Sequence, residues 1–177
     1  MPTKNFSSIG GFAVGSTEVV NTAFELKNIS AIHMVSDNFA DATHDKYLVK
    51  RVTDAANNTL QLTLDGTTAL TTNSPALAAD RVSFIKARVF GQETTSNQYV
   101  YATTFDIVVT TANDGTPTTS AVYENIIRNN PPGQEVWNVT PDAFQIGGAP
   151  FFTFEVKSVT TNSTVKWIGV LDITVVS

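Results

Sequence analysis

Apolar and polar residues alternate with a period of two in several segments between residue 45 and the end of the chain, as expected for β-strands with one buried face. The clearest cases are 59–64, with Leu60, Leu62 and Leu64 on one face, and 98–111. One face of the second segment carries Tyr99, Tyr101, Thr103, Phe105, Ile107 and Val109. Such segments recur at short spacing between Gly, Pro, Asn and Asp residues, which is typical of an antiparallel β-sandwich. We expect about eight strands, drawn from the segments 47–53, 59–64, 67–71, 81–90, 98–111, 120–128, 136–139, 151–159 and 164–176.

One short connection predicts a hairpin. Asp65-Gly66 follows 59–64 directly. This dipeptide favours a type I′ turn, in which both central residues need positive φ. We therefore expect 59–64 to turn back into 67–71.

Two segments carry apolar residues on both faces. In 81–90, Val82 and Phe84 lie in one phase of the alternation and Ile85, Ala87 and Val89 in the other, and this slip predicts a β-bulge. In 164–176 one face carries Val165, Trp167, Gly169, Leu171, Ile173 and Val175, while Ile168, Val170 and Val176 lie on the other. A strand that is apolar on both faces is expected inside a sandwich or against a neighbouring subunit.

Residues 1–44 lack this regularity, and we interpret them as an extended N-terminal arm that precedes a sandwich domain at 45–177. The arm has scattered apolar residues that cannot close a core alone, so we expect them to pack against another surface during assembly. The candidate assembly contacts are Phe6, Ile9, Phe12, Val14, Leu26, Ile29 and Ile32. The polar run at 37–45 is expected to be a connector.

Composition supports strands rather than helices. The chain has 26 Thr and 20 Val but only 11 Lys and Arg among its 177 residues. Thr and Val are stiff at χ1 and favour strands. The net charge of −5 argues against nucleic-acid binding, which depends on neutralising phosphates. No apolar run is long enough to cross a membrane as a helix, and the N-terminus lacks the apolar region of a signal peptide.

Residues capable of catalysis or metal binding are few and show no recognisable spacing. The chain has no Cys and two His, so we expect no cofactor, no metal site and no enzymatic activity. His33, Asp37, Asp41, His44 and Asp45 are interpreted as part of a solvated linker. The carboxylates of Asp106, Glu124, Asp142 and Glu155 are interpreted as outward-facing strand residues.

Four aromatic residues are candidates for a surface that binds a ligand by stacking: Tyr99, Tyr101, Tyr123 and Trp137. Aromatic residues of a sandwich also fill its core or a subunit interface. The sequence alone leaves both interpretations open.

Two stretches resemble virion structural proteins of tailed bacteriophages, especially cyanophages. Residues 10–21, followed by Leu26-Lys27-Asn28-Ile29, are similar to a segment near the start of tail-fibre-like proteins. Residues 99–109 together with 165–176 are similar to the β-sandwich module that closes many phage appendage proteins, ending in a strand that contains Trp. The chain has no long repetitive shaft between them, so the resemblance implies a short fibre, an appendage or a head-decoration protein.

The resemblance implies a non-enzymatic structural component of the virion, made in the host cytoplasm. We expect a homo-oligomer, with a trimer favoured, that contacts other virion proteins of the capsid or tail and does not insert into a membrane. The alternative function is a receptor-binding or carbohydrate-binding module that recognises a glycan of the host surface.

Overall fold

The computed structural model of the chain describes residues 12–14, 17–20, 29, 31–36, 39–55, 59–67, 73–159 and 163–176. The chain has two compact units, Met1–Ser30 and Ala31–Ser177. In the first unit β1 (Phe12–Val14) pairs antiparallel with β2 (Thr17–Val20). The described residues form no helix, and so none that is long and apolar enough to cross a membrane.

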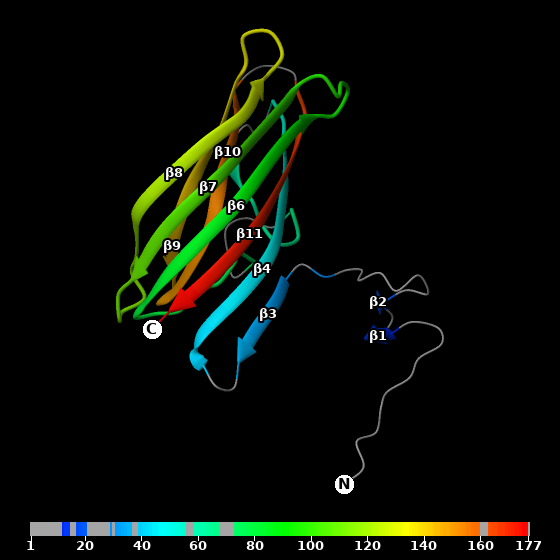
Figure 1. Ribbon diagram of the computed structural model, residues 1–177. Helices are drawn as coiled ribbons and strands as arrows, with labels where there is room; N and C mark the ends of the chain where they lie inside the picture. Colours follow the sequence, from blue (N-terminus) through cyan, green and yellow to red (C-terminus); the bar gives the residue numbers. More distant parts are fainter. Residues whose placement is uncertain are drawn as a thin grey trace. The chain divides into compact units, whose positions relative to one another are not determined.

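The larger sheet of the second unit has six strands in the order β3-β4-β11-β6-β7-β8 (Figure 1). Its strands are β3 (Ala31–Ser36), β4 (Phe39–Thr53), β6 (Arg81–Glu93), β7 (Val100–Thr111), β8 (Pro117–Asn130) and β11 (Val165–Val176). All neighbouring strands are antiparallel. The C-terminal strand β11, red in Figure 1, therefore lies inside the sheet between β4 and β6.

A smaller sheet packs against one face of the larger one. Its order is β5-β10-β9, formed by β5 (Thr59–Gln61), β9 (Val136–Ile146) and β10 (Ala149–Val159). The ring centroids of Phe105 on β7 and Phe154 on β10 are 4.9 Å apart across the two layers. The predicted antiparallel β-sandwich is confirmed, with nine strands in its two sheets where about eight were expected.

The core forms because alternate residues of each strand point toward the opposite sheet. Buried and exposed positions alternate along β6 from Ser83 to Glu93, and along β11 every second residue from Val165 to Val175 is buried while those between are exposed or partly exposed. On β7 the inward positions from Tyr101 to Thr111 are all buried. The inward faces predicted for 98–111 and 164–176 are therefore confirmed in these strands.

A group of aromatic rings fills one end of the core. The ring of Trp167 lies 5.8 Å from that of Trp137 and 5.9 Å from that of Tyr101. The indole Nε1 of Trp167 donates a hydrogen bond of 2.9 Å to Thr53 Oγ1. A Cβ atom added to Gly91 would lie 2.5 Å from the Trp167 ring. Glycine at this position therefore gives the indole the space that it fills.

The β-bulge predicted in 81–90 was wrong. β6 pairs with both β7 and β11 in a continuous register. Phe84 points away from the core and its side chain is 52% exposed, while Ser83 takes the buried inward position. The apparent slip arises because apolar residues lie on both faces of this strand.

The type I′ turn predicted at Asp65-Gly66 was also wrong. Gly66 has φ +78°, but among the described residues other than glycine only Asp80 has positive φ. Side-chain hydrogen bonds hold the bend, because Asp65 Oδ1 accepts from Thr63 Oγ1 at 3.0 Å and from the Thr67 amide at 2.9 Å. Most of the return segment expected at 67–71 lies outside the described residues.

The connector predicted at 37–45 was wrong for residues 39–45, which belong to β4. β4 pairs with β3 on one side and with β11 on the other. It runs without a break past residues 44 and 45, where the sequence placed a domain boundary, and the compact unit begins at Ala31. Polar residues occupy this strand because one of its faces is open and the buried carboxylate of Asp45 pairs with His33.

Candidate functional site

The face of the six-stranded sheet that points away from the smaller sheet is the outer face. Its residues are identified by the strand register, since residues directly opposite each other on antiparallel strands point to the same side. Opposed residues form rows that cross the sheet. Each row contains the outer-face side chains that are neighbours across the strands.

The middle row, here the charged row, alternates in sign across four strands. It runs from Lys46 on β4 through Asp172 on β11 and Lys86 on β6 to Asp106 on β7. Lys46 Nζ lies 2.5 Å from Asp172 Oδ1, and Lys86 Nζ lies 3.9 Å from Asp106 Oδ1. His44 Nε2 lies 3.4 Å from the same Asp172 oxygen. The hydrogen bond from Lys46 lowers the pKa of Asp172, so this carboxylate stays charged.

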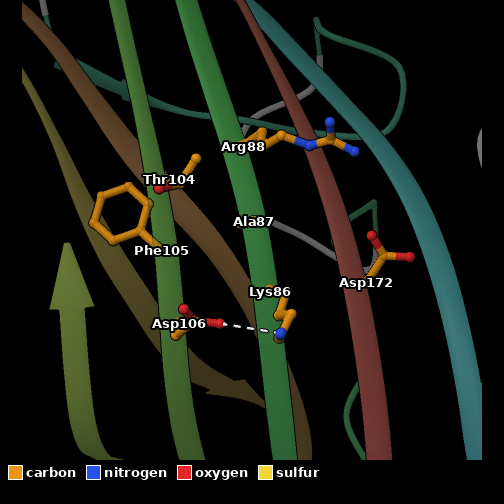
Figure 2. Close-up of a pocket in the computed structure, with 7 residues that line it drawn as sticks. All are labelled: Lys86, Ala87, Arg88, Thr104, Phe105, Asp106 and Asp172. Atoms are coloured by element: carbon orange, nitrogen blue, oxygen red, sulfur yellow. Dashed lines mark ion pairs between the residues drawn. The ribbon is translucent and has the colours of Figure 1, made fainter. Parts of the chain in front are cut away.

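A hollow of about 260 Å³ lies over this row. Its lining residues are Lys86, Ala87, Arg88, Thr104, Phe105, Asp106 and Asp172. Figure 2 shows Lys86 turned toward Asp106 on the neighbouring strand, while the side chain of Arg88 extends over β11. The hollow is smaller than most ligand pockets, and both of its carboxylates are paired with lysines.

Three further rows on one side of the charged row form a region that we term the basic half-face. Its residues are Leu48, Val170, Arg88, Thr104 and Asn125 in the first row, Lys50, Ile168, Phe90, Ala102 and Arg128 in the second, and Val52, Lys166, Gln92, Val100 and Asn130 in the third. Four of these fifteen residues are cations and none is an acid. Among the described residues, none of these four cations has an ion-pair partner.

Apolar side chains lie between these cations. Leu48, Val52, Phe90 and Ile168 are each between 41% and 46% exposed. A second hollow of about 300 Å³ opens beside them, lined by Lys50, Arg51, Val52, Asp65, Gly66, Lys166, Trp167 and Ile168. Exposed apolar groups gathered in this way mark interaction surfaces more often than isolated ones do.

The outermost strand β8 forms a second unusual surface. Every residue from Thr118 to Asn130 is exposed, and β8 pairs only with β7 among the described strands. Val122 lies opposite buried Ile107, and Ile126 lies opposite buried Thr103, so both point to the inner side of the sheet. They are nevertheless 49% and 51% exposed. The smaller sheet therefore leaves the inner side of β8 uncovered.

Side-chain hydrogen bonds of Glu124 hold β8 against β7. Its Oε1 accepts hydrogen bonds from Tyr101 Oη at 3.1 Å and from Thr103 Oγ1 at 3.0 Å. Burial of the phenol, with the nearby carboxylate, raises the pKa of Tyr101, so the hydroxyl keeps its proton. β8 is thus ordered against β7 although its own side chains are exposed.

The predicted aromatic binding surface is not assembled. Tyr101 and Trp137 are 1% and 2% exposed and lie in the core, so neither presents a ring face to a ligand. Tyr99 is partly buried against the same core. Tyr123 is 67% exposed and stands on the outer face of β8, opposite Asp106. For Tyr101 and Trp137 the ligand-contact interpretation was wrong, because both rings are buried in the core of the sandwich.

The candidate assembly residues are described in part. Phe6, Ile9 and Leu26 lie outside the described residues. Phe12 and Val14 belong to β1, and Ile29 is partly buried. Ile32 stands on the outer face of β3 with 41% exposure. Their role in assembly stays a prediction.

The two histidines lie on neighbouring strands and on opposite faces of the sheet, His33 on β3 and His44 on β4. His33 Nδ1 contacts the buried Asp45 carboxylate on the inner side, while His44 Nδ1 lies 2.9 Å from Thr174 Oγ1 on the outer face. Asp37 and the side chain of Asp41 lie outside the part of the chain that the structure describes. Among the described residues no group of three or more His, Asp or Glu could hold a metal ion.

The four carboxylates considered for acid–base chemistry are dispersed. Asp106 pairs with Lys86 on the outer face, and Glu124 accepts from Tyr101 on the inner side of β8. Asp142 and Glu155 belong to the smaller sheet, at strand positions one row apart. Partial burial raises the pKa of Asp142.

The sequence analysis missed Lys50, Arg88, Arg128 and Lys166. Each occupies an outward position of a different strand, and only the strand order brings them onto one half of a sheet face. A signal was present in part, because Lys50 shares a strand phase with Leu48 and Val52, and Lys166 with Ile168. The net charge of −5 gives no indication of this local excess of cations.

No family model matches this sequence, and no curated protein matches it either. Among solved structures, the tailspike protein of Acinetobacter baumannii phage AM24 is similar with a TM-score of 0.31 and 10% sequence identity. The match covers 73% of this chain and 26% of the tailspike, so the chain spans about a quarter of that protein's length. A TM-score this low does not establish a common fold.

Proposed function

We propose that this protein is a structural component of a tailed-phage virion that assembles with further copies of itself through β8, without catalysing a reaction. The single observation that carries the assembly proposal is the exposure of β8. This strand has fourteen residues, and its apolar groups Val122, Tyr123, Ile126 and Ile127 are between 49% and 67% exposed. The resemblance of residues 10–21 and 26–29, and of residues 99–109 together with 165–176, to phage proteins supports the location in a virion.

Strand chemistry favours this role for β8. An open edge presents backbone N–H and C=O groups that can pair with another chain, and many proteins protect such edges with charges or proline. From Thr118 to Asn130 this edge has only Glu124 and Arg128 as charged residues. Glu124 is already hydrogen-bonded to Tyr101 and Thr103. The edge therefore has little charge to repel a second strand.

Two irregularities limit the contact to a defined stretch. The register with β7 shifts between Ala102 and Thr103 and again between Val108 and Val109. These β-bulges bend the strand and interrupt regular pairing. The regular stretch between them, residues 121–126, carries Val122 and Ile126 on its uncovered inner side. We expect the neighbouring copy to cover these two side chains.

The test is the mass of the full-length protein in sedimentation velocity over a range of concentrations. The native chain is expected to form a concentration-dependent oligomer, and Ile126→Lys is expected to shift it toward the monomer because a buried lysine without a partner is costly. Val176→Lys is the matched control, since Val176 is 48% exposed on the outer face of β11, and β6 and β7 lie between β11 and β8 in the sheet. This variant should associate as the native chain does.

Circular dichroism verifies that both variants keep the native strand content. A native chain that stays monomeric at every concentration would overturn the proposal. An Ile126→Lys protein that associates as strongly as the native chain would also overturn it.

A further inference from the structure

The charges of the second unit are strongly segregated. Nine Lys and Arg side chains and twelve Asp and Glu side chains are described in the structure. Six of these cations and two of these acids lie on the outer face, which gives this face a formal charge of +4. The remaining three cations and ten acids give the rest of the described residues a charge of −7. The outer face is therefore basic although the net charge of the chain is −5.

We propose that the basic half-face binds an extended acidic segment of another protein. The half-face includes Asn125, Arg128 and Asn130 of β8, but it lies on the outer face of the sheet, whereas the self-assembly proposed above uses the open edge of β8 and its inner side. The proposal therefore does not depend on that self-assembly. On the charged row each lysine already has a carboxylate partner. On the basic half-face the four cations have no ion-pair partner among the described residues, and a carboxylate from a second molecule would supply one.

The size of the surface favours one segment over a broad interface. Strands are spaced by ~4.8 Å and alternate residues by ~6.8 Å, so five strands and three rows span about 24 Å by about 20 Å, or about 480 Å². Stable protein complexes bury about 800 Å² on each partner. An extended chain at ~3.4 Å per residue crosses 24 Å in about seven residues. The half-face therefore suits a single short strand or loop.

The arrangement of groups favours a peptide over a sugar. In the central row Ile168 and Phe90 lie directly opposite each other, between Lys50 at one end and Arg128 at the other. Apolar side chains at the centre with charges around them are typical of protein interfaces. Phe90 is the one aromatic ring among the fifteen residues, so the surface offers little area for stacking on sugar rings. An acidic segment with apolar side chains would satisfy both kinds of group.

The test uses a fluorescein-labelled peptide of eight residues that alternates glutamate with leucine, and fluorescence anisotropy measures its binding to the full-length protein. We expect binding that weakens as salt is added. Lys50→Ala and Lys166→Ala are each expected to weaken it by about two- to fivefold, the range of a single exposed ion pair. Ile168→Ser should weaken it too, since it removes apolar contact.

Lys157→Ala is the matched control, because Lys157 is also an exposed lysine but lies on the smaller sheet. It should leave the affinity unchanged. The proposal is overturned if the peptide does not bind, if Lys157→Ala weakens binding as much as Lys166→Ala does, or if a glutamine version of the peptide binds equally well. Binding of polygalacturonate at least as tight as that of the peptide would identify a glycan site and would also overturn it.

Discussion

Replacing Gly91 with alanine tests how tightly the aromatic end of the core is packed. The added Cβ would lie 2.5 Å from Cζ3 and 2.6 Å from Cε3 of Trp167. Carbon atoms in contact are normally ~3.5–4.0 Å apart, so the ring must move by about 1 Å. Trp167 is fully buried and is held by Trp137, Tyr101 and the hydrogen bond to Thr53. These contacts oppose a shift of the indole.

The expected cost follows from this overlap. Overpacking a core costs about 1–3 kcal/mol. The alanine substitution recovers about 0.4–1 kcal/mol by restricting the unfolded chain, so we expect a net loss of about 1–2 kcal/mol. For a chain of this length each kcal/mol lowers Tm by about 2–4 °C, which gives a decrease of about 2–8 °C.

Thermal unfolding followed by circular dichroism measures this decrease. Gln92→Ala is the control, since Gln92 is the next residue of β6 but points outward, and its Tm should change little. Gly91→Ala should cost less in a Trp167→Phe background, because the smaller ring leaves room for the methyl group. If Gly91→Ala unfolds at the native temperature, or costs the same in both backgrounds, the packing argument fails.

Two further substitutions probe polar contacts. Thr53→Val removes the acceptor of the Trp167 Nε1–H and of the Ser158 hydroxyl, and we expect urea unfolding to show a loss of about 2 kcal/mol, whereas Thr53→Ser should keep most of the stability. An unchanged Thr53→Val protein would contradict the hydrogen bonding described here. Asp172 has a lowered pKa in the folded state, so its contribution is complete above its ordinary pKa of 3.8 and is lost as the pH falls through the lowered value. The stability of Asp172→Asn should therefore depend less steeply on pH below about pH 4 than that of the native chain, and identical acid unfolding curves would refute this.

The sequence predicted the sandwich because its inward-facing residues follow the period of a strand. The alternation from Tyr99 to Val109 and from Val165 to Val175 marks the faces that the structure buries. The same rule failed for Phe84, since apolar residues also occupy the outer face of β6. Alternation identifies the two faces of a strand but does not show which of them another layer covers.

The candidate surfaces depended on strand order, which local patterns do not encode. Lys50 and Arg128 lie 78 positions apart in the sequence and at the two ends of one row of the sheet. Tyr101 and Tyr123 carry the same ring, yet one fills the core and the other is exposed on the outermost strand. Whether each tyrosine is buried depends on its position in the sheet. That position follows from pairing between strands that are far apart in the sequence.

Hydrogen exchange of the β8 backbone tests the central claim, that this strand is an assembly surface. An open edge exchanges its unpaired amides with solvent, whereas an edge covered by a second copy is protected. If β8 mediates assembly, amides between Ala121 and Ile126 exchange more slowly as the protein concentration rises, and those of β11 in the sheet interior do not change. If exchange in β8 is the same at all concentrations while the protein is oligomeric, the copies meet elsewhere and the claim is wrong.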